Sequence, residues 1–281
     1  MERRTFLRTT MYGLAGAGVA SGLYAWQVEP FWLEFVTIKM PVKNLPDALI
    51  GKTLMQISDL HIGKRFDYRF VIDSLQRAKE YKPDFVVYTG DYISLHNGEV
   101  QYDELHEVLQ HIVHGELGTV GILGNHDYGK NWRQANVADT IATLLSDNGI
   151  VMLRNTRQEF NGLNVIGFDD YWGLNFHPEE VMGNHQPEKA TIVLCHNPDV
   201  CDTDVWNGYR GWILSGHTHG GQCKPPFLPP PMLPVKNKRY SSGVIDIDND
   251  RTLYVNRALG HLWQVRFNVR PEITLFELMK G

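Results

Sequence analysis

Five short motifs combine Asp, Asn and His in a way that suits a divalent metal. They are Asp59-x-His61, Gly90-Asp91, Gly124-Asn125-His126-Asp127, Cys195-His196-Asn197-Pro198 and Gly216-His217-Thr218-His219. One Asp-x-His pair is weak evidence, because such pairs are common in solvated loops. Five motifs in succession carry more weight, since carboxylate, amide and imidazole groups together form a mixed oxygen and nitrogen ligand set. The sequence therefore predicts a metal site whose ligands suit Mn, Fe, Zn or Co without choosing among them.

Each motif follows a short apolar run that predicts a β-strand. These runs are rich in β-branched residues and span residues 53–57, 85–89, 119–123, 191–195 and 212–215. Loops at the carboxyl ends of strands are where α/β sheets place ligands, and glycines there let the backbone approach a bound ion. If the extended backbone continues past residue 57, Asp59 and His61 share one face.

The remaining elements predict a layered α/β domain. Further strands are expected at 35–40, 163–168, 244–247, 252–255 and 273–278, and the spacing of apolar residues predicts helices over 68–81, 103–113 and 135–148. Strands and helices alternate at first and strands dominate later, which places helices outside and sheets inside. Residues 224–234 contain six prolines and predict an extended loop. Cys195, Cys201 and Cys223 have no metal-site spacing, so we expect mostly buried thiols.

The order of the five motifs closely resembles the calcineurin-like metallophosphoesterase superfamily, whose blocks run D-x-H, G-D, G-N-H-D/E, H and G-H-x-H. All five blocks are present between residues 59 and 219 without a substitution. The resemblance implies a four-layer α/β/β/α sandwich with two metals at the sheet edge. Residues 45–63, 216–222 and the N-terminal arginines look like the exported or membrane-associated bacterial branch of the superfamily.

The resemblance also implies roles for the motif residues. One divalent metal would be held by Asp59, His61, Asp91 and His219, and the other by Asp91, Asn125, His196 and His217. Two ions about 3.5–4 Å apart can share a water and lower its pKa, so that a metal-bridging hydroxide attacks phosphorus in line. His126 is the implied acid or transition-state stabiliser, with a structural role as the alternative, and Asp127 is expected to orient its imidazole.

Arg257 is a candidate ligand for a substrate phosphate. It lies in Asn256-Arg257-Ala258-Leu259-Gly260, which resembles a family turn that usually reads Arg-Gly-Leu-Gly, and Ala258 departs from that pattern. A guanidinium near the metals could clamp a phosphate oxygen. The alternative is a structural salt bridge.

The first 28 residues differ from the rest of the chain. Arg3, Arg4 and Arg8 against Glu2 give them a charge of +2, so the −5 of the whole chain leaves −7 for residues 29–281. An uncharged stretch rich in Gly and Ala follows at 11–26, which is the layout of an export signal. Residues 2–8 resemble a twin-arginine signal, and a frayed amphipathic terminus is the alternative.

We therefore expect residues 1–28 to be a signal or membrane anchor and residues 29–281 to form the catalytic domain. The A-x-A sequence at residues 15–17 lies inside the apolar stretch, which favours an uncleaved, weak anchor over cleavage. The expected location is the cell envelope, in association with the inner membrane. The membrane surface is then one partner of the protein.

Composition and loop chemistry narrow the substrate. The net charge of −5 over 281 residues argues against nucleic acid as a partner. Loop 224–234 places apolar residues beside Lys236, Lys238 and Arg239, which suits an amphiphilic phosphoester, although a rigid cover for the sandwich is the alternative. The leading hypothesis is a membrane-associated phosphodiesterase for a lipid-linked or envelope phosphodiester. Hydrolysis of UDP-2,3-diacylglucosamine in lipid A synthesis is the alternative reaction, and a catalytically silent, metal-dependent envelope binding module is the alternative of another class.

Overall fold

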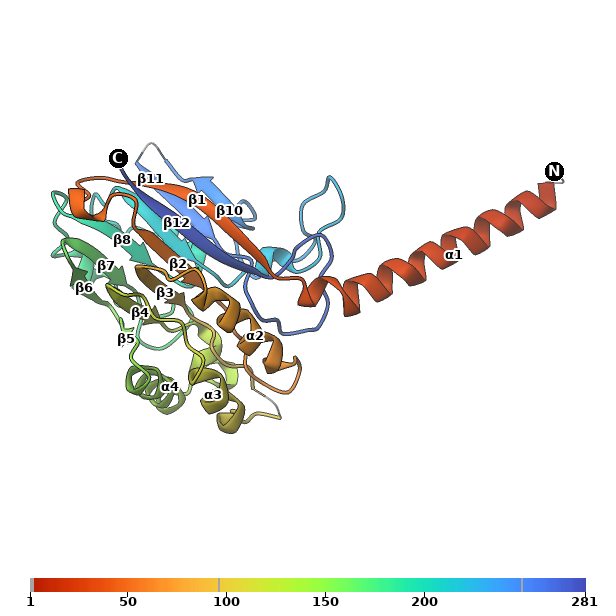
Figure 1. Cartoon of the computed structure of the whole chain (residues 1–281), viewed down its shortest axis with the longest axis horizontal. Helices are drawn as coiled ribbons and strands as arrows, with labels where there is room; N and C mark the ends of the chain where they lie inside the picture. The colour runs from red at the N-terminus through yellow and green to blue at the C-terminus, as the bar shows by residue number, and fades with distance from the viewer. Residues whose placement is uncertain (1–2, 96, 249) are drawn as a thin grey trace.

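Two six-stranded sheets lie face to face in the computed structural model, which describes residues 3–95, 97–248 and 250–281 (Figure 1). The first sheet has the order β1-β12-β2-β3-β4-β5. Its strands are β1 (Glu34–Val42), β12 (Glu272–Lys280), β2 (Thr53–Ile57), β3 (Phe85–Thr89), β4 (Gly118–Ile122) and β5 (Val151–Met152). Strands β2 to β5 are parallel, whereas β12 runs antiparallel to β2 and parallel to β1.

The second sheet has the order β10-β11-β9-β8-β7-β6. Its strands are β10 (Gly243–Asp246), β11 (Arg251–Val255), β9 (Gly211–Ser215), β8 (Ala190–Leu194), β7 (Leu163–Gly167) and β6 (Thr156–Phe160). The four central strands are parallel, and the two edge strands β6 and β10 are antiparallel to their neighbours. Parallel strands end at one edge, so both sheets deliver loops to the same side of the sandwich.

Helices cover the outer faces of the sheets. The first sheet is covered by α2 (Tyr68–Lys79), α3 (Tyr102–Leu109) and α4 (Ala135–Asp147), which bury side chains such as Leu75, Leu105 and Ile141 against it. The second sheet is covered more thinly, by α5 (Glu179–Met182) and the 3-10 segment Pro198–Asp202. The arrangement confirms the α/β class and the sandwich of two sheets flanked by helices.

Strand β3 shows why these sheets have continuous apolar sequences. Phe85 and Val87 point between the two sheets, while Val86 and Tyr88 point into the helical layer. Because both faces of the strand are buried, Phe85 to Tyr88 are apolar or aromatic in succession, and the alternation typical of a half-exposed strand is lost.

The predicted elements match the structure closely, with two informative exceptions. Predicted strands 53–57 and 85–89 are β2 and β3 without any change of bounds, and helix 135–148 is α4. Helix 103–113 is shorter than predicted, because α3 ends at Leu109. Strand β6 was not predicted, since it is an exposed edge strand of mainly polar sequence. As expected, Cys195 and Cys201 are buried, and Cys223 is half-buried.

Helix α1 (Arg3–Gln27) projects away from the sandwich (Figure 1). Only its last turn is attached, through the Ala25 carbonyl, which accepts from the Arg266 main-chain N–H at 2.9 Å, and the Trp26 carbonyl, which accepts from Gln264 Nε2 at 3.1 Å. Among the helices of the described residues, none combines the length and apolar character needed to cross a membrane.

Candidate metal centre

The five motifs meet at the carboxyl edge of the two sheets. They follow β2, β3 and β4 of the first sheet and β8 and β9 of the second, so the ligand candidates come from both sheets. Each of the seven candidate ligands is buried: Asp59, His61, Asp91, Asn125, His196, His217 and His219. The structure therefore brings together side chains that are 160 positions apart in sequence from first to last.

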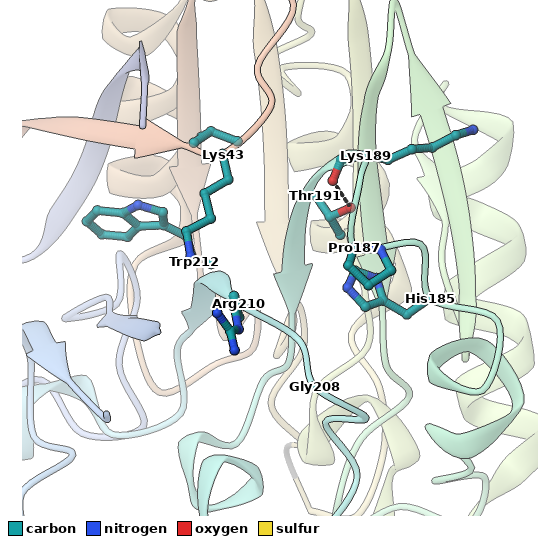
Figure 2. Close-up of a pocket in the computed structure, with 10 residues that line it drawn as sticks. Lys43, His185, Pro187, Lys189, Thr191, Gly208, Arg210 and Trp212 are labelled. Atoms are coloured by element: carbon teal, nitrogen blue, oxygen red, sulfur yellow. Dashed lines mark hydrogen bonds between the residues drawn. The ribbon is translucent and has the colours of Figure 1, made fainter. Parts of the chain in front are cut away.

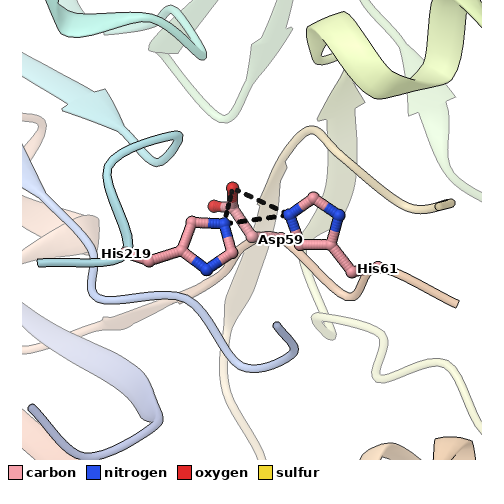
Figure 3. Close-up of side chains that lie close together, drawn as sticks. All are labelled: Asp59, His61 and His219. Carbon is pink, nitrogen blue, oxygen red and sulfur yellow. Dashed lines mark hydrogen bonds and ion pairs between the residues drawn. The ribbon is translucent and has the colours of Figure 1, made fainter. Parts of the chain in front are cut away.

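The first ligand group consists of Asp59, His61 and His219 (Figure 3). Asp59 Oδ1 lies 3.2 Å from His219 Nε2 and 3.7 Å from His61 Nε2. The two imidazole Nε2 atoms are 2.9 Å apart. Three lone-pair-bearing atoms thus converge on one small volume, which is an arrangement that a cation stabilises.

The second ligand group consists of Asp91, His196 and His217. Asp91 Oδ2 lies 3.1 Å from His196 Nε2 and also 3.6 Å from His61 Nε2 of the first group. Asp91 therefore faces both groups, which is the position expected for a bridging ligand. A third combination, His61 with Asp91 and His126, also has ligand atoms within reach of one another.

Hydrogen bonds on the far side of the rings leave the inner nitrogens available to a metal. His196 Nδ1 lies 2.7 Å from the Thr89 carbonyl oxygen, and His217 Nε2 lies 3.0 Å from the Pro234 carbonyl oxygen. Because a carbonyl oxygen only accepts, each of these nitrogens carries a proton, and the other ring nitrogen is the one that could bind a metal. No sequence pattern indicates Thr89 or Pro234 in this role.

Three buried polar atoms of the predicted ligands have no hydrogen-bond partner among the described residues. They are Asn125 Oδ1, His196 Nε2 and His219 Nδ1. A buried polar atom without a partner is costly unless an ion or water satisfies it. The donor set and the unpartnered Asn125 Oδ1 and His196 Nε2 fit a pair of divalent cations.

The backbone of the centre is strained at five ligand positions. Asp59, His61, Asp91, His217 and His219 all have positive φ, between 49° and 70°. The expectation that an extended backbone carries Asp59 and His61 onto one face is therefore wrong, since both residues are left-handed. Their convergence comes from the left-handed residues of the loop after β2, and residues other than Gly, Asn and Asp rarely adopt this conformation away from functional sites.

Glycines make room for the carboxylates. A Cβ added to Gly124 would lie 2.3 Å from Asp91 Oδ1, and one added to Gly216 would lie 2.2 Å from Asp59 Oδ2. Any side chain at these positions would displace a candidate ligand. This explains why both motifs contain a glycine next to the metal-binding residues.

Asp127 has a different role from the one expected. Its carboxylate accepts main-chain N–H bonds from Gly124, Asp91 and Tyr92 at 2.8–2.9 Å, with a longer bond from Ile93. Both oxygens are thus occupied by the backbone, in place of the expected contact with the His126 imidazole. Asp127 shapes the loop that presents Asp91, so it is a positioning residue.

His126 lies beside the ligands with its ring directed into the cavity. Its main-chain N–H donates to Asp91 Oδ1 at 2.8 Å, and its ring centroid is 5.0 Å from that of His61. Burial lowers the pKa of His126 to about 4. The ring is therefore neutral at pH 7, which favours the N–H donor role over the role of a protonated acid.

Arg257 forms the salt bridge that was its alternative role. Its guanidinium pairs with Glu272 and, at 2.8 Å, with Glu34, and its side chain does not line the metal cavity. The turn that contains Arg257 has another function, because the main-chain N–H groups of Leu259 and Gly260 donate to the Ser58 and Asp59 carbonyls at 2.8–2.9 Å. Through these two hydrogen bonds, the turn holds the main chain at the start of the Asp59-x-His61 motif.

The fully buried Arg266, which the sequence did not reveal, holds that turn together. Its guanidinium donates to the carbonyl oxygens of Arg257, Ala258 and Gly260 and to His261 Nδ1, at 2.8–3.1 Å. No motif contains Arg266, and only the folded chain brings its donors to these acceptors.

The buried histidines predict a pH effect on the stability of the metal-free protein. Burial, and then the charge of His196, lower the pKa of His217 to about 3. Between pH 6.5 and 5 the unfolded chain therefore binds a proton that folded His217 does not, so His217 lowers the stability as the pH falls, by about 1.4 kcal/mol per pH unit. Burial raises the pKa of Asp170 to about 7, which acts in the opposite direction over the same range.

A comparison with His217→Asn isolates the His217 effect. The free energy of unfolding of the metal-free proteins is measured in urea at pH 6.5 and at pH 5. Between these two pH values the wild type should lose about 2 kcal/mol more stability than the variant. Equal pH dependence of the two proteins would contradict the buried, neutral state of His217.

The metal centre opens into a cavity of about 950 Å³. Its polar lining includes Asp91, Asn125, His126, His217 and His219 of the centre, together with Thr218, Gln222 and Lys238. The rest of its wall is largely apolar and aromatic: Trp132, Trp172, Met232, Leu233, Leu262, Trp263 and Val265. Trp132 and Trp172 are stacked with ring centroids 4.8 Å apart, and Trp172 also packs edge-on against His217.

A second cavity, of about 450 Å³, lies at the opposite edge of the second sheet, before β8 and β9 (Figure 2). Lys43, Lys189 and Arg210 line it. Asp250 pairs with Lys43 and Arg210, and Glu159 pairs with Lys189. These two carboxylates offset part of the charge of the three cations.

Comparison with known proteins agrees with the geometry. Residues 52–221 match the calcineurin-like phosphoesterase family. Phosphodiesterase YaeI of Escherichia coli K12 is 29% identical to this chain, with 99% of this chain and 100% of YaeI covered. The uncharacterized metallophosphoesterase YkuE of Bacillus subtilis 168 is also 29% identical, with 99% and 98% covered. UDP-2,3-diacylglucosamine pyrophosphatase LpxG of Chlamydia trachomatis serovar D is 26% identical, with 95% of each chain covered.

The matched segment, 52–221, contains all five motifs and each of the seven candidate ligands. It begins just before β2 and ends just after the last ligand, His219. The chain belongs to the calcineurin-like phosphoesterase family of metal-dependent phosphoric ester hydrolases.

Proposed function

We propose that the protein is a phosphodiesterase that uses two divalent metal ions to hydrolyse a lipid-linked or envelope phosphodiester. The observation that carries this proposal is the position of the ligand groups, which lie at the floor of a large cavity with mainly apolar walls. A phosphate at the floor would meet the metals, and an ester substituent would extend along the apolar wall. Ligand sites commonly combine such walls with a few polar groups at one end.

The metal ligands are assigned as the motifs predict. Asp59, His61, Asp91 and His219 would hold one ion, and Asp91, Asn125, His196 and His217 the other. Bound divalent ions would supply Lewis-acid polarisation of the phosphoryl oxygens and a water of lowered pKa. Asp59 and Asp91 contribute two negative charges against four positive ones, so the loaded centre is positive and attracts a phosphate although the chain is acidic.

His126 is the protein side chain that would contact the reacting phosphoryl group. Its neutral ring can donate an N–H to an oxygen of the phosphoryl group or of the leaving alcohol, where negative charge accumulates. Asp127 acts through the loop that it holds, since its hydrogen bonds fix the main chain of Asp91. The stacked Trp132 and Trp172 shield the floor of the cavity from water at one side.

The names of two relatives agree with the two reactions considered for this chain. The name of YaeI, phosphodiesterase, agrees with the leading proposal, while LpxG is named for the pyrophosphate of UDP-2,3-diacylglucosamine. The second substrate also joins a phosphoester to acyl chains, so the apolar wall suits either. Hydrolysis of UDP-2,3-diacylglucosamine is therefore kept as the alternative reaction.

We further propose that the protein works at the cell envelope, associated with the inner membrane. The support is the sequence of its N-terminus, where the arginines of a twin-arginine-like signal precede an uncharged stretch. In the structure this segment is helix α1, which leaves the sandwich at the end where loops 222–239 and 261–268 lie (Figure 1).

The substrate proposal predicts a preference for long-chain diesters. With Mn²⁺ present, the protein should hydrolyse bis-p-nitrophenyl phosphate, and kcat/KM for a long-chain alkyl phosphodiester should exceed that for its short-chain homologue by about tenfold or more. Trp263→Ala should reduce this ratio, because Trp263 lines the apolar wall. The ratio is measured by product release under matched detergent.

The same assays separate the alternatives. Release of UMP from UDP-2,3-diacylglucosamine at a higher kcat/KM than any phosphodiester would favour the alternative reaction. Binding of two metal equivalents with no turnover of any diester would instead favour the silent binding module. A chain-length ratio of one would contradict the lipid-linked substrate.

A further inference from the structure

We propose that the mouth of the metal cavity is a docking surface for an anionic lipid bilayer. This docking rim consists of the three loops 129–134, 222–239 and 261–268, which contribute Trp132, Met232 and Trp263 to the cavity. The inference rests on the proposed function, because it explains how a lipid-linked substrate reaches the metals. It goes further in naming the surface that meets the bilayer and the lipid charge that the surface selects.

The docking rim exposes large apolar side chains at its outer edge. Phe227 is fully exposed, and Met232, Trp263 and Leu228 are 79%, 67% and 59% exposed. Apolar side chains of this size gathered on neighbouring loops mark a surface that binds something apolar. Met232 and Trp263 also line the cavity, so the apolar surface continues from the rim to the wall above the metal centre.

The docking rim is basic, although the chain as a whole is acidic. Its three loops contain no Asp or Glu and carry six exposed cations: Lys130, Arg133, Lys224, Lys236, Lys238 and Arg239. None of these six forms a salt bridge with another of the described residues. Each Lys or Arg close to an anionic bilayer adds to the electrostatic attraction.

The rim is structurally joined to helix α1. The main chain of Phe267 bonds to that of Gln222 and Lys224, which connects two rim loops, and its ring packs edge-on against Tyr24 of α1 at 6.4 Å. The described part of α1 also contains three arginines and no acidic residue, and it exposes Leu14 and Val19. Figure 1 shows α1 and the rim loops 222–239 and 261–268 at the same end of the molecule.

This combination favours a bilayer over a soluble polyanion. A polyanion binds cations and does not require exposed Phe227, Leu228 or Met232, whereas the interface of an anionic bilayer accommodates cations at the head groups and apolar side chains below them. A docked rim would present the cavity mouth to the head groups. The phosphodiester of a lipid could then reach the metals while its chains remain in apolar surroundings.

Vesicle binding of the metal-free, full-length protein tests the docking rim. We expect cosedimentation with vesicles of phosphatidylcholine and phosphatidylglycerol, and much weaker cosedimentation with phosphatidylcholine alone. Phe227→Ser/Leu228→Ser and Lys224→Glu/Lys236→Glu should each weaken binding to the anionic vesicles by about tenfold. The matched controls, Ile50→Ser and Lys39→Glu/Lys82→Glu, change exposed residues outside the rim and should leave vesicle binding unchanged.

A second measurement separates the rim from α1, which is expected to bind lipid as well. Hydrogen exchange on addition of anionic vesicles should slow in residues 222–239 and 261–268. The inference would be overturned if hydrogen exchange in these two loops were unchanged and both rim variants bound vesicles as strongly as the wild type. Equal binding to soluble polyphosphate and to vesicles would overturn it also.

Vesicle binding by the rim can be tested separately from the proposed phosphodiesterase activity. None of the four substituted rim residues lines the metal cavity, so hydrolysis of water-soluble bis-p-nitrophenyl phosphate serves as the control of folding. A protein that hydrolyses this diester and does not bind vesicles would contradict the docking rim alone. A protein that binds vesicles through the rim and hydrolyses no diester would contradict the proposed function alone.

Discussion

Replacing Asp91 with asparagine is expected to reduce metal-dependent turnover of bis-p-nitrophenyl phosphate by about a thousandfold or more, which corresponds to roughly 4 kcal/mol of activation free energy. Asp91 Oδ2 faces His196 and His61, and so both ligand groups. Asparagine keeps the shape of the side chain and removes its charge. The variant should therefore fold and lose at least one of its two metal equivalents.

Turnover and metal content are measured on the same preparation. Asp84→Asn is the matched control, because Asp84 is a partly buried acid that pairs with Lys52 and bonds to Thr53 at the far end of β2. It should retain two metal equivalents and near wild-type turnover. An Asp91→Asn protein with full turnover would rule out Asp91 as the shared ligand of a two-metal site.

Replacing His126 with alanine is expected to lower turnover by about 10²–10³-fold while the metal content stays at two equivalents. His126 is the one histidine of the centre that the motifs do not assign as a ligand, and its pKa of about 4 keeps it neutral. As an N–H donor to the departing oxygen, it matters more when that oxygen is more basic. The loss should therefore be larger for an alkyl leaving group than for p-nitrophenolate.

The control for this variant is His106→Ala, since His106 is exposed on α3. Loss of a metal equivalent in His126→Ala would identify His126 as a ligand, as its proximity to His61 and Asp91 would permit. An equal loss of rate for both leaving groups would argue against proton donation and leave a structural role.

The sheets, and the gathering of the five motifs at one edge, could be predicted from sequence because both depend on local patterns, whereas the division of the ligands between two metals stays a prediction of the family resemblance. Strands β2 and β3 are short apolar runs with both faces buried, so their bounds are visible in the sequence. Parallel strands bring their carboxyl ends to one edge, and this places Asp59 and Asp91 together although they are 32 positions apart. Edge strand β6 was missed because its exposed polar residues resemble a loop.

Roles that depend on hydrogen bonds between distant segments could not be predicted. Asp127 is adjacent to His126 in sequence, and this adjacency suggested the imidazole as its partner. In the fold, however, the main chain of residues 91–93 occupies its oxygens. The motif around Arg257 predicts a ligand for a substrate phosphate. In the fold, Arg257 instead pairs with Glu34 and Glu272, of which Glu34 is far away in sequence.

The backbone conformation at the metal centre also could not be predicted from sequence patterns. Left-handed φ is usually signalled by Gly or Asn, and here it occurs at His61, His217 and His219. The hydrogen bonds around each ring offset part of the cost of about 1–3 kcal/mol per strained residue, and bound cations would offset more of it. A metal-free chain keeps this strain with less compensation, so metal binding should stabilise the protein.

Phosphodiester hydrolysis is expected to require two divalent ions held by the seven candidate ligands of the centre. The requirement is measured as the rate of bis-p-nitrophenyl phosphate hydrolysis by chelated protein as Mn²⁺ is returned, with bound metal counted in the same samples. We expect no turnover without metal and full turnover only when two equivalents are bound per chain. Turnover that persists after complete removal of metal would rule out this requirement.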